Sequence, residues 1–276
     1  RGYCLNACTD VLSLRGIEKN LESAAAECTL ELLPCTASTN SLLRQRAAEG
    51  APEGLVILAN QQTRGRGRLG REFYSPPDTG VYMSILLRPR ELRPMRAVHI
   101  TTMAAVAACA AIGELTQKTP QIKWVNDILL GGKKVCGILT EGSFNLETGQ
   151  LEDVVLGIGF NVYPPAGGFP AELADTADSI LFEQTDEGKN RLAASFLNHF
   201  FRIYRSGDTA DYVRAYREKS MVIGKTVRII TPDGERTAHV LDIDRDCRLV
   251  VRYEDGSIEQ LSSAQISICA DADTHI

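Results

Sequence analysis

The most informative stretch of this sequence is Gln62-Thr63-Arg64-Gly65-Arg66-Gly67-Arg68-Leu69-Gly70-Arg71, which follows the apolar run Leu55–Leu58. Arginines this close repel one another, and the glycines remove side-chain support, so we expect a loop that is disordered when empty and ordered by a ligand. Guanidinium groups fork onto phosphate and carboxylate oxygens. The stretch therefore predicts an anion-binding loop, and a solvated basic surface loop is the alternative.

The same loop contains Gly65, Gly67 and Gly70, which match the G-x-G-x-x-G fingerprint of dinucleotide-binding folds. That fingerprint requires a helix beginning at the loop. Here the chain continues Phe73-Tyr74-Ser75-Pro76-Pro77-Asp78-Thr79-Gly80, whose prolines oppose a long helix. No acidic residue ends a strand about 20 residues further on, where the sequence reads Leu86-Leu87-Arg88-Pro89. A nicotinamide-binding fold is therefore disfavoured.

The bulk composition describes an ordinary globular protein. The chain has 276 residues, 44% hydrophobic residues and a net charge of −5, which argues against a binder of nucleic acid or membrane surface over its whole length. We see no signal peptide and no apolar run approaching the about 20 residues that span a bilayer. The cysteines form no C-x-x-C pair and the histidines lack ligand spacing, so we expect free thiols, a cytoplasmic protein and no metal site.

Apolar periodicity and turn residues predict both strands and helices along the chain. The predicted strands and helices lie in this order: helix 14–26, strand 31–33, helix 40–49 capped by Ser38 or Thr39 and closed by Gly50, strands 55–59 and 81–87, helix 95–112 stopped by Gly113, strands 121–124, 128–130, 135–141 and 154–162, and helices 189–205 and 208–219. Gly131-Gly132 predicts the hairpin turn between two of these strands.

The sequence pattern changes after Gly224, where the predicted elements become short. Short strands at 225–230, 237–243, 249–253 and 257–261 alternate with turn signals, which is typical of a small β-barrel. We therefore divide the chain into a connector (1–28), a ligand-binding catalytic domain (29–220) and a C-terminal barrel (221–276).

A polar cluster is predicted where Lys123-Trp124-Val125-Asn126-Asp127 joins two strands and Lys134 follows the hairpin turn. Strand ends place side chains in clefts, although a surface hairpin with ordinary charges explains the pattern equally well. Gly157 and Gly159 stand where a strand normally has side chains, which suggests that another group approaches the backbone; a bulge is the alternative.

Taken together and in this order, these motifs strongly resemble the biotin–protein ligases. The set comprises Ser38-Thr39-Asn40, Gln62 with the Gly-Arg loop, Lys123-Trp124 with Asn126-Asp127, Lys134 with Gly137-Ile138-Leu139, and Gly157, Gly159 and Asn161. The resemblance runs from about residue 38 to the C-terminus. It implies an α+β fold: a catalytic domain like that of class II aminoacyl-tRNA synthetases, with a mixed sheet and flanking helices, and an SH3-like C-terminal barrel. Arg1–Leu5 resembles the end of a winged-helix repressor domain.

The resemblance implies a two-step reaction. The carboxylate of biotin attacks the α-phosphorus of Mg²⁺-ATP to give biotinyl-5′-adenylate, and a lysine of a biotin carboxyl carrier domain then takes the biotinyl group. Positioning and charge neutralisation carry most catalysis of this kind. The expected substrates and cofactors are therefore biotin, ATP and Mg²⁺.

The resemblance also implies a role for individual residues. The catalytic residues are Lys134, Arg68 and Asp127. The biotin-binding residues are Ser38, Thr39, Asn40, Gln62, Gly65, Arg66, Gly67, Arg68, Lys134 and Gly137. The nucleotide-binding residues are Arg66, Arg68, Arg71, Phe73, Lys123, Asn126 and Asn161, with Asn161 reading the adenine.

Three positions depart from the family pattern. Phe73 replaces a common tryptophan and so lacks its indole N–H, Val125 replaces the usual proline, and Leu69 stands where some relatives have a further basic residue. The charged positions are kept, so these departures bear on nucleotide affinity rather than on activity.

Two other interpretations stay open. A lipoate–protein ligase shares the architecture but does not normally carry this loop together with K-W-x-N-D. A biotin-sensing repressor, whose effector part this chain forms, would bind DNA only if a winged-helix domain precedes it. A ligand-sensing paralogue without activity is expected to lose Lys134 or Arg68, and both are present. A homodimer is left open, and no membrane partner is expected.

Overall fold

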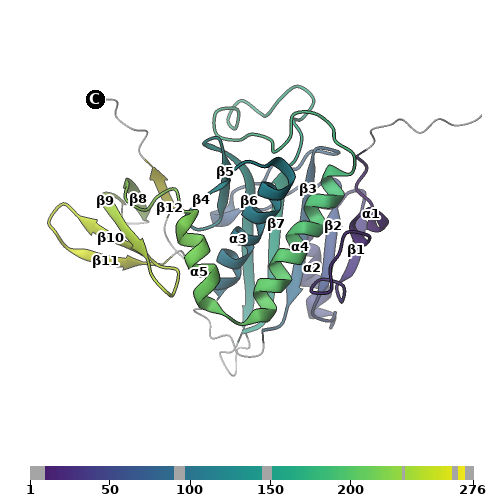
Figure 1. Cartoon of the computed structure of the whole chain (residues 1–276), viewed down its shortest axis with the longest axis horizontal. Coiled ribbons are helices and arrows are strands. Elements are labelled where there is room, and N and C mark those ends of the chain that lie inside the picture. The colour runs from purple at the N-terminus through teal and green to yellow at the C-terminus, as the bar shows by residue number, and fades with distance from the viewer. Residues whose placement is uncertain (1–9, 90–96, 145–150, 232–233, 263–266, 271–276) are drawn as a thin grey trace, which may run out of the picture.

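The computed structural model describes residues 10–89, 97–144, 151–231, 234–262 and 267–270. In these residues a large sheet is flanked by helices, and a smaller sheet lies beside its β4 end (Figure 1). The predicted α+β class with a mixed sheet and a small C-terminal β-domain is confirmed.

The large sheet has seven strands in the order β1-β2-β3-β7-β6-β5-β4. Their bounds are β1 Thr29–Leu33, β2 Leu55–Ala59, β3 Gly80–Leu87, β4 Gln121–Lys123, β5 Asp127–Leu130, β6 Lys133–Phe144 and β7 Leu151–Asn161. Strands β1 and β2 are parallel, and the other neighbours are antiparallel. Gly131 and Gly132 form the predicted turn between β5 and β6, both with positive φ (61° and 85°).

The helices are α1 Leu14–Glu18, α2 Thr39–Ala48, α3 Ala97–Thr116, α4 Gly188–Ser206 and α5 Thr209–Glu218. Helix α2 provides the crossover that the parallel pair β1–β2 requires. It begins at the predicted cap Ser38, whose hydroxyl accepts a hydrogen bond from the Ser41 amide.

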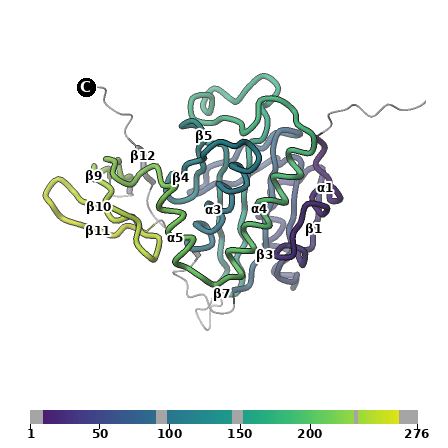
Figure 2. The backbone as a smooth tube through the Cα atoms, in the orientation of Figure 1, coloured from purple at the N-terminus to yellow at the C-terminus, as the bar shows by residue number. Residues whose placement is uncertain are grey.

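Helices pack on both faces of the large sheet. Along β2, Val56 and Leu58 belong to the main core with α3 and α4, whereas Ile57 packs with Leu43 of α2 on the other face. All residues of β2 are buried, which explains its unbroken apolar sequence. Figure 2 shows α3 and α4 running alongside each other over the sheet.

Two predicted helix ends were wrong. The helix expected over 14–26 ends at Glu18, because the Asn20 side chain bonds the Gly16 carbonyl and the chain then turns to bond α4 through Asn198. The long helix does not stop at Gly113. It continues to Thr116 and ends at Gln117, which has the left-handed φ of 58°.

Helix α3 forms the centre of the main core. Among the described residues it is the one helix long and apolar enough, by length and composition alone, to cross a membrane, and 67% of that stretch is buried within the fold. A buried core helix passes the same test, and α3 behaves as one.

The C-terminal sheet has five antiparallel strands in the order β11-β10-β9-β8-β12. They are β8 Thr226–Thr231, β9 Gly234–Ile243, β10 Leu249–Tyr253, β11 Ile258–Leu261 and β12 Ser267–Ala270, of which β12 was not predicted. Its inner residues join the main core cluster. Cys247, in the turn before β10, accepts a hydrogen bond from the buried Trp124 indole at its carbonyl oxygen (3.1 Å).

The proposed connector packs on α4 where the structure describes it. Asn190 and Asn198 of α4 bond the backbone of residues 11, 13, 20 and 22. Residues 1–9, with the winged-helix resemblance of Arg1–Leu5, lie outside the described residues.

Candidate functional site

The Gly-Arg loop leaves the end of β2 and folds on itself. Arg68–Gly70 form a 3₁₀ turn, and two backbone bonds close the loop, from Gly67 N to Arg71 O (2.7 Å) and from Phe73 N to Gly65 O (2.9 Å). A Cβ at Gly65 would lie 2.3 Å from the Phe73 carbonyl oxygen, so this glycine permits the close approach of two backbones.

A row of uncharged polar side chains lies beside the loop, over β2 and β3. The Gln62 Oε1 accepts from both the amide and the hydroxyl of Thr39 (2.9 and 3.1 Å). The Gln62 Nε2 donates to Ser75 Oγ (2.9 Å), and the buried Ser84 donates toward Thr39 Oγ1 (2.7 Å). These hydroxyl and amide groups are held in fixed orientations, which suits a neutral ligand with hydrogen-bonding edges.

Glycines form the floor of the site on β6 and β7. A Cβ at Gly157 would lie 2.0 Å from the Asn40 Oδ1, and one at Gly159 would lie 2.4 Å from the Phe73 ring. The neighbouring Gly137, paired with Gly159, would clash with the same ring at 2.9 Å. The prediction that other groups approach the backbone at Gly157 and Gly159 is therefore confirmed.

Replacing Gly157 with alanine is expected to destabilise the protein by about 1–3 kcal/mol, because the Cβ overlaps a fixed side chain. Asn40 cannot move freely, since it bonds Ser84 (2.6 Å) and Glu141 (3.0 Å). Chemical denaturation measures the change. Gly113→Ala is the matched control. A Cβ there would have its nearest neighbour 3.5 Å away, so this substitution within a helix should raise the free energy of unfolding by up to about 1 kcal/mol. Equal stability of the two variants would contradict the packing argument.

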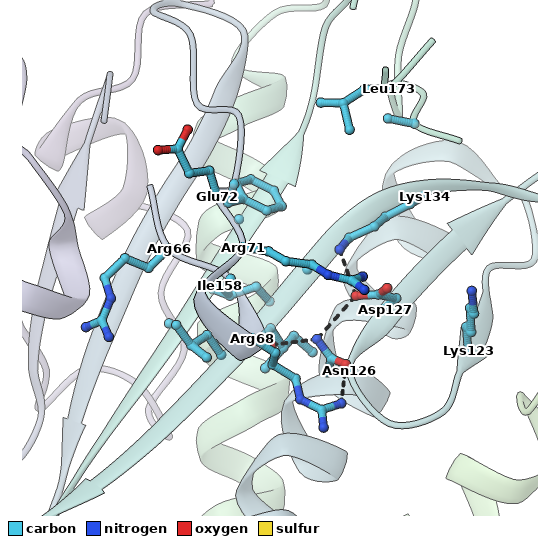
Figure 3. Close-up of a pocket in the computed structure, with 18 of the residues that line it drawn as sticks. Arg66, Arg68, Arg71, Glu72, Lys123, Asn126, Asp127, Lys134, Ile158 and Leu173 are labelled. Carbon is cyan, nitrogen blue, oxygen red and sulfur yellow. Dashed lines mark hydrogen bonds and ion pairs between the residues drawn. The ribbon is translucent and has the colours of Figure 1, made fainter. Parts of the chain in front are cut away.

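Charged groups gather over β5 and β6, as Figure 3 shows. The Arg68 Nη1 donates to Asn126 Oδ1 (3.2 Å), Asn126 Nδ2 donates to Asp127 Oδ1 (3.2 Å), and Lys134 Nζ lies 2.8 Å from the same carboxylate. Burial lowers the pKa of the Arg68 guanidinium, and the nearby Asp127 opposes that shift. Of the predicted polar cluster, Asn126, Asp127 and Lys134 come together with Arg68 added, whereas Lys123, which was predicted to belong to it, does not join them.

The other predicted basic residues point in different directions (Figure 3). Arg71 points toward Lys134 and Asp127. Lys123 stands apart on β4. Arg66 turns away from the cluster and forms an ion pair with Glu141 (3.0 Å). Lys134 also lies near the face of Phe73, with Nζ 5.8 Å from the ring centroid.

These groups line one cavity of about 500 Å³. It contains most of the residues predicted from the sequence: Ser38, Thr39, Asn40, Gln62, Arg66, Gly67, Arg68, Arg71, Phe73, Lys123, Asn126, Asp127, Lys134 and Gly137. Gly65 and Asn161 do not line it. The side chain of Asn161 instead donates to the Asp178 carbonyl (3.2 Å), which holds the segment beside the cavity.

The cavity wall also includes residues that were not predicted. Leu173 and residues 175–177 come from the long segment between β7 and α4, where the Lys134 amide donates to Thr176 O (2.8 Å). Glu72, Trp124 and Ile158 also line it. The segment has no periodic pattern, so its sequence does not predict that it lines the cavity. Its unusual length is the one signal, because long connections without secondary structure are commonly functional.

The chain matches two family models. The model of the biotin/lipoate A/B protein ligase family covers residues 32–161, and that of the biotin protein ligase C-terminal domain covers residues 222–268. The bifunctional ligase/repressor BirA of Bacillus subtilis is 34% identical over 238 residues, which cover 84% of this chain and 71% of the relative. The chain belongs to the biotin/lipoate A/B protein ligase family.

Further relatives narrow the type of ligase. The biotin–[acetyl-CoA-carboxylase] ligase of Mycobacterium tuberculosis is 32% identical over 228 residues, covering 80% of this chain and 82% of the relative. The solved biotin protein ligase of Aquifex aeolicus, in complex with biotin and ATP, superposes with a TM-score of 0.73 over 88% of this chain and 99% of that chain, at 24% identity. That likeness confirms the fold, and the relatives confirm the resemblance to the biotin protein ligases.

Proposed function

We propose that this enzyme activates biotin with ATP and transfers it to a lysine of a biotin carboxyl carrier domain. One observation carries the proposal: the uncharged row of Thr39 and Gln62 and the charged cluster of Arg68, Asp127 and Lys134 line the same cavity. The ureido ring of biotin has hydrogen-bonding edges that suit the first set. Its carboxylate and the phosphates of ATP require the second.

In the first step the biotin carboxylate oxygen forms a bond to the α-phosphorus, and the bond between this phosphorus and the bridging oxygen of pyrophosphate breaks. Lys134 and Arg68 offset the repulsion between two anions and hold them together. Asp127 and Asn126 orient Lys134 and Arg68 through the hydrogen-bonded chain that joins all four side chains.

In the second step a lysine amine attacks the carbonyl carbon of the adenylate, its proton is lost, and AMP leaves. Asp127 is the carboxylate of the charged cluster and so the group we assign to positioning this amine. Phe73 offers an aromatic face for the adenine. Arg71, Lys123 and Asn161 are proposed to bind the nucleotide, Asn161 by placing residue 178 rather than from within the cavity wall.

Mg²⁺ is expected to accompany ATP. Among the described residues, no group of three or more His, Cys, Asp or Glu side chains is arranged to hold a metal ion. Mg²⁺ commonly keeps several waters and binds through substrate phosphates. These residues therefore fit an ion carried by the triphosphate rather than one caged by the protein.

The described cysteines are free, and three of them are buried (Cys109, Cys136 and Cys247). Free thiols agree with the cytoplasmic location that we propose. A homodimer stays a prediction, as does DNA binding by a protein in which a winged-helix domain accompanies this chain.

The test is to incubate the protein with biotin and ATP and to detect bound biotinyl-adenylate by native mass spectrometry. A parallel incubation replaces biotin with lipoate. We expect the biotinyl adduct alone. A lipoyl adduct without a biotinyl one would make the protein a lipoate ligase, and no adduct with either acid would overturn the proposed activation step.

A further inference from the structure

Glu141 on β6 receives more polar contacts than any role assigned so far explains. Arg66 contacts its carboxylate with both terminal nitrogens, Nη2 to Oε1 at 3.0 Å and Nη1 to Oε2 at 3.1 Å. Asn40 donates to Oε2 (3.0 Å), and Arg44 lies 3.5 Å from Oε1. The Glu141 side chain is only 18% exposed, so this carboxylate is a shared, largely desolvated partner.

The contacts come from three separate parts of the chain. Asn40 and Arg44 belong to α2, Arg66 to the Gly-Arg loop, and Glu141 to the sheet. The middle of the loop reaches the sheet region through side chains, Arg66 to Glu141 and Arg68 to Asn126. A two-pronged arginine–carboxylate contact fixes direction as well as distance. The Arg66 contact therefore sets where the loop lies over the cavity.

Glu141 itself does not line the ligand cavity. It lines a second cavity together with Thr101 and Arg248, and Arg66 lines both cavities. The guanidinium of Arg66 points away from Lys134 and Asp127 (Figure 3). Arg66 is thus held outside the charged cluster by Glu141, which does not line the ligand cavity.

We propose that Glu141 is a positioning residue that latches the Gly-Arg loop closed through Arg66, and so sets how long the activated intermediate is retained. The inference rests on the proposed function, because retention of an adenylate matters only to an enzyme that forms one. Glu141 does not line the ligand cavity and is therefore not placed to touch the ligand or the reacting atoms. Its effect falls on release of the intermediate and not on the rate of its formation.

The test compares Glu141→Gln with Arg66→Gln and with the double variant. Glutamine keeps the size of the side chain and an oxygen that accepts from Asn40, but it loses the charge. Arg44→Gln is the matched control, because it removes a cation that contacts the same carboxylate from α2 and not from the loop. The readouts are dissociation of preformed biotinyl-adenylate, pyrophosphate exchange, melting temperature, and hydrogen exchange at residues 64–72.

We expect each single variant to release the adenylate roughly 2- to 5-fold faster, the fold-change that corresponds to the energy range of a partly exposed ion pair. The double variant should release it no faster than the single ones, because one contact is removed twice. Hydrogen exchange at residues 64–72 should become faster in these variants, while the pyrophosphate-exchange rate of Glu141→Gln stays near wild type. All readouts of Arg44→Gln should stay near wild type.

Unchanged or slower release from Glu141→Gln, or additive effects in the double variant, would overturn the latch. Slower release would mean instead that Glu141 withholds Arg66 from the nucleotide. If wild-type protein forms no adenylate, the proposed function fails, and hydrogen exchange of the ligand-free variants still decides the latch: equal exchange at residues 64–72 in wild type and Glu141→Gln rejects it.

Discussion

Replacing Lys134 with alanine is expected to lower biotin-dependent pyrophosphate exchange by about 10²–10³-fold, the range seen when one preorganised stabilising group is removed. A lysine supplies a compact mobile charge that can follow the carboxylate as it becomes an acyl phosphate. The fold should survive, because the Lys134–Asp127 pair is partly exposed (34% and 26% for the two side chains) and such pairs contribute about 1 kcal/mol or less.

Lys133→Ala is the matched control for this experiment. The neighbouring lysine has the same side chain, but its Nζ donates to the Ala174 carbonyl (3.0 Å) and it does not line the cavity. The pyrophosphate-exchange rate of Lys133→Ala should stay within about twofold of wild type, as is usual for a surface substitution. Near-normal pyrophosphate exchange by a folded Lys134→Ala variant would show that Lys134 takes no part in adenylate formation.

Removal of the C-terminal barrel is expected to leave a catalytic domain that binds ATP and transfers biotin poorly. The barrel supports the strand connection that carries Asn126 and Asp127, since Trp124 donates its indole N–H to Cys247 O. It also contacts α3, where Thr102 lies 3.4 Å from the Cys247 sulfur. A chain truncated after Val222 should still melt cooperatively, with biotinylation of an acceptor domain at least tenfold slower, because small misplacements of catalytic groups cost up to about 10²-fold in rate. Transfer at the full-length rate would exclude any role for the barrel.

A variant of the whole chain separates this contact from the loss of a domain. Trp124→Phe keeps an aromatic ring but leaves the buried Cys247 carbonyl without its donor, which costs about 1–3 kcal/mol. We expect a lower melting temperature together with a reduced rate of transfer. A variant that loses stability but keeps its rate would show that the contact holds the domains together without positioning Asn126 and Asp127.

Much of the fold was predictable because its signals are local. The strand Leu55–Ala59 was predicted with its observed ends, since an apolar run bounded by turn residues marks a strand buried on both faces. The Ser38 cap and the turn at Gly131-Gly132 follow from hydrogen-bonding and backbone preferences of single residues. The end of α3 was not predictable from Gly113, because this glycine keeps its helical hydrogen bond, accepting from the Gln117 amide (2.8 Å), and so does not stop the helix.

The sequence by itself determined most of the residues that line the site. Its motifs predicted Lys134, Asp127 and Gln62, and the glycines of β7 predicted that other groups approach the backbone of this strand. Only the tertiary structure decided how these groups are arranged. Nothing in the local sequence shows that Arg66 turns to Glu141, 75 residues away, or that Asn161 holds residue 178 instead of entering the cavity. Such contacts depend on strand register and on the path of loops without periodicity, and those are set when distant segments pack against one another.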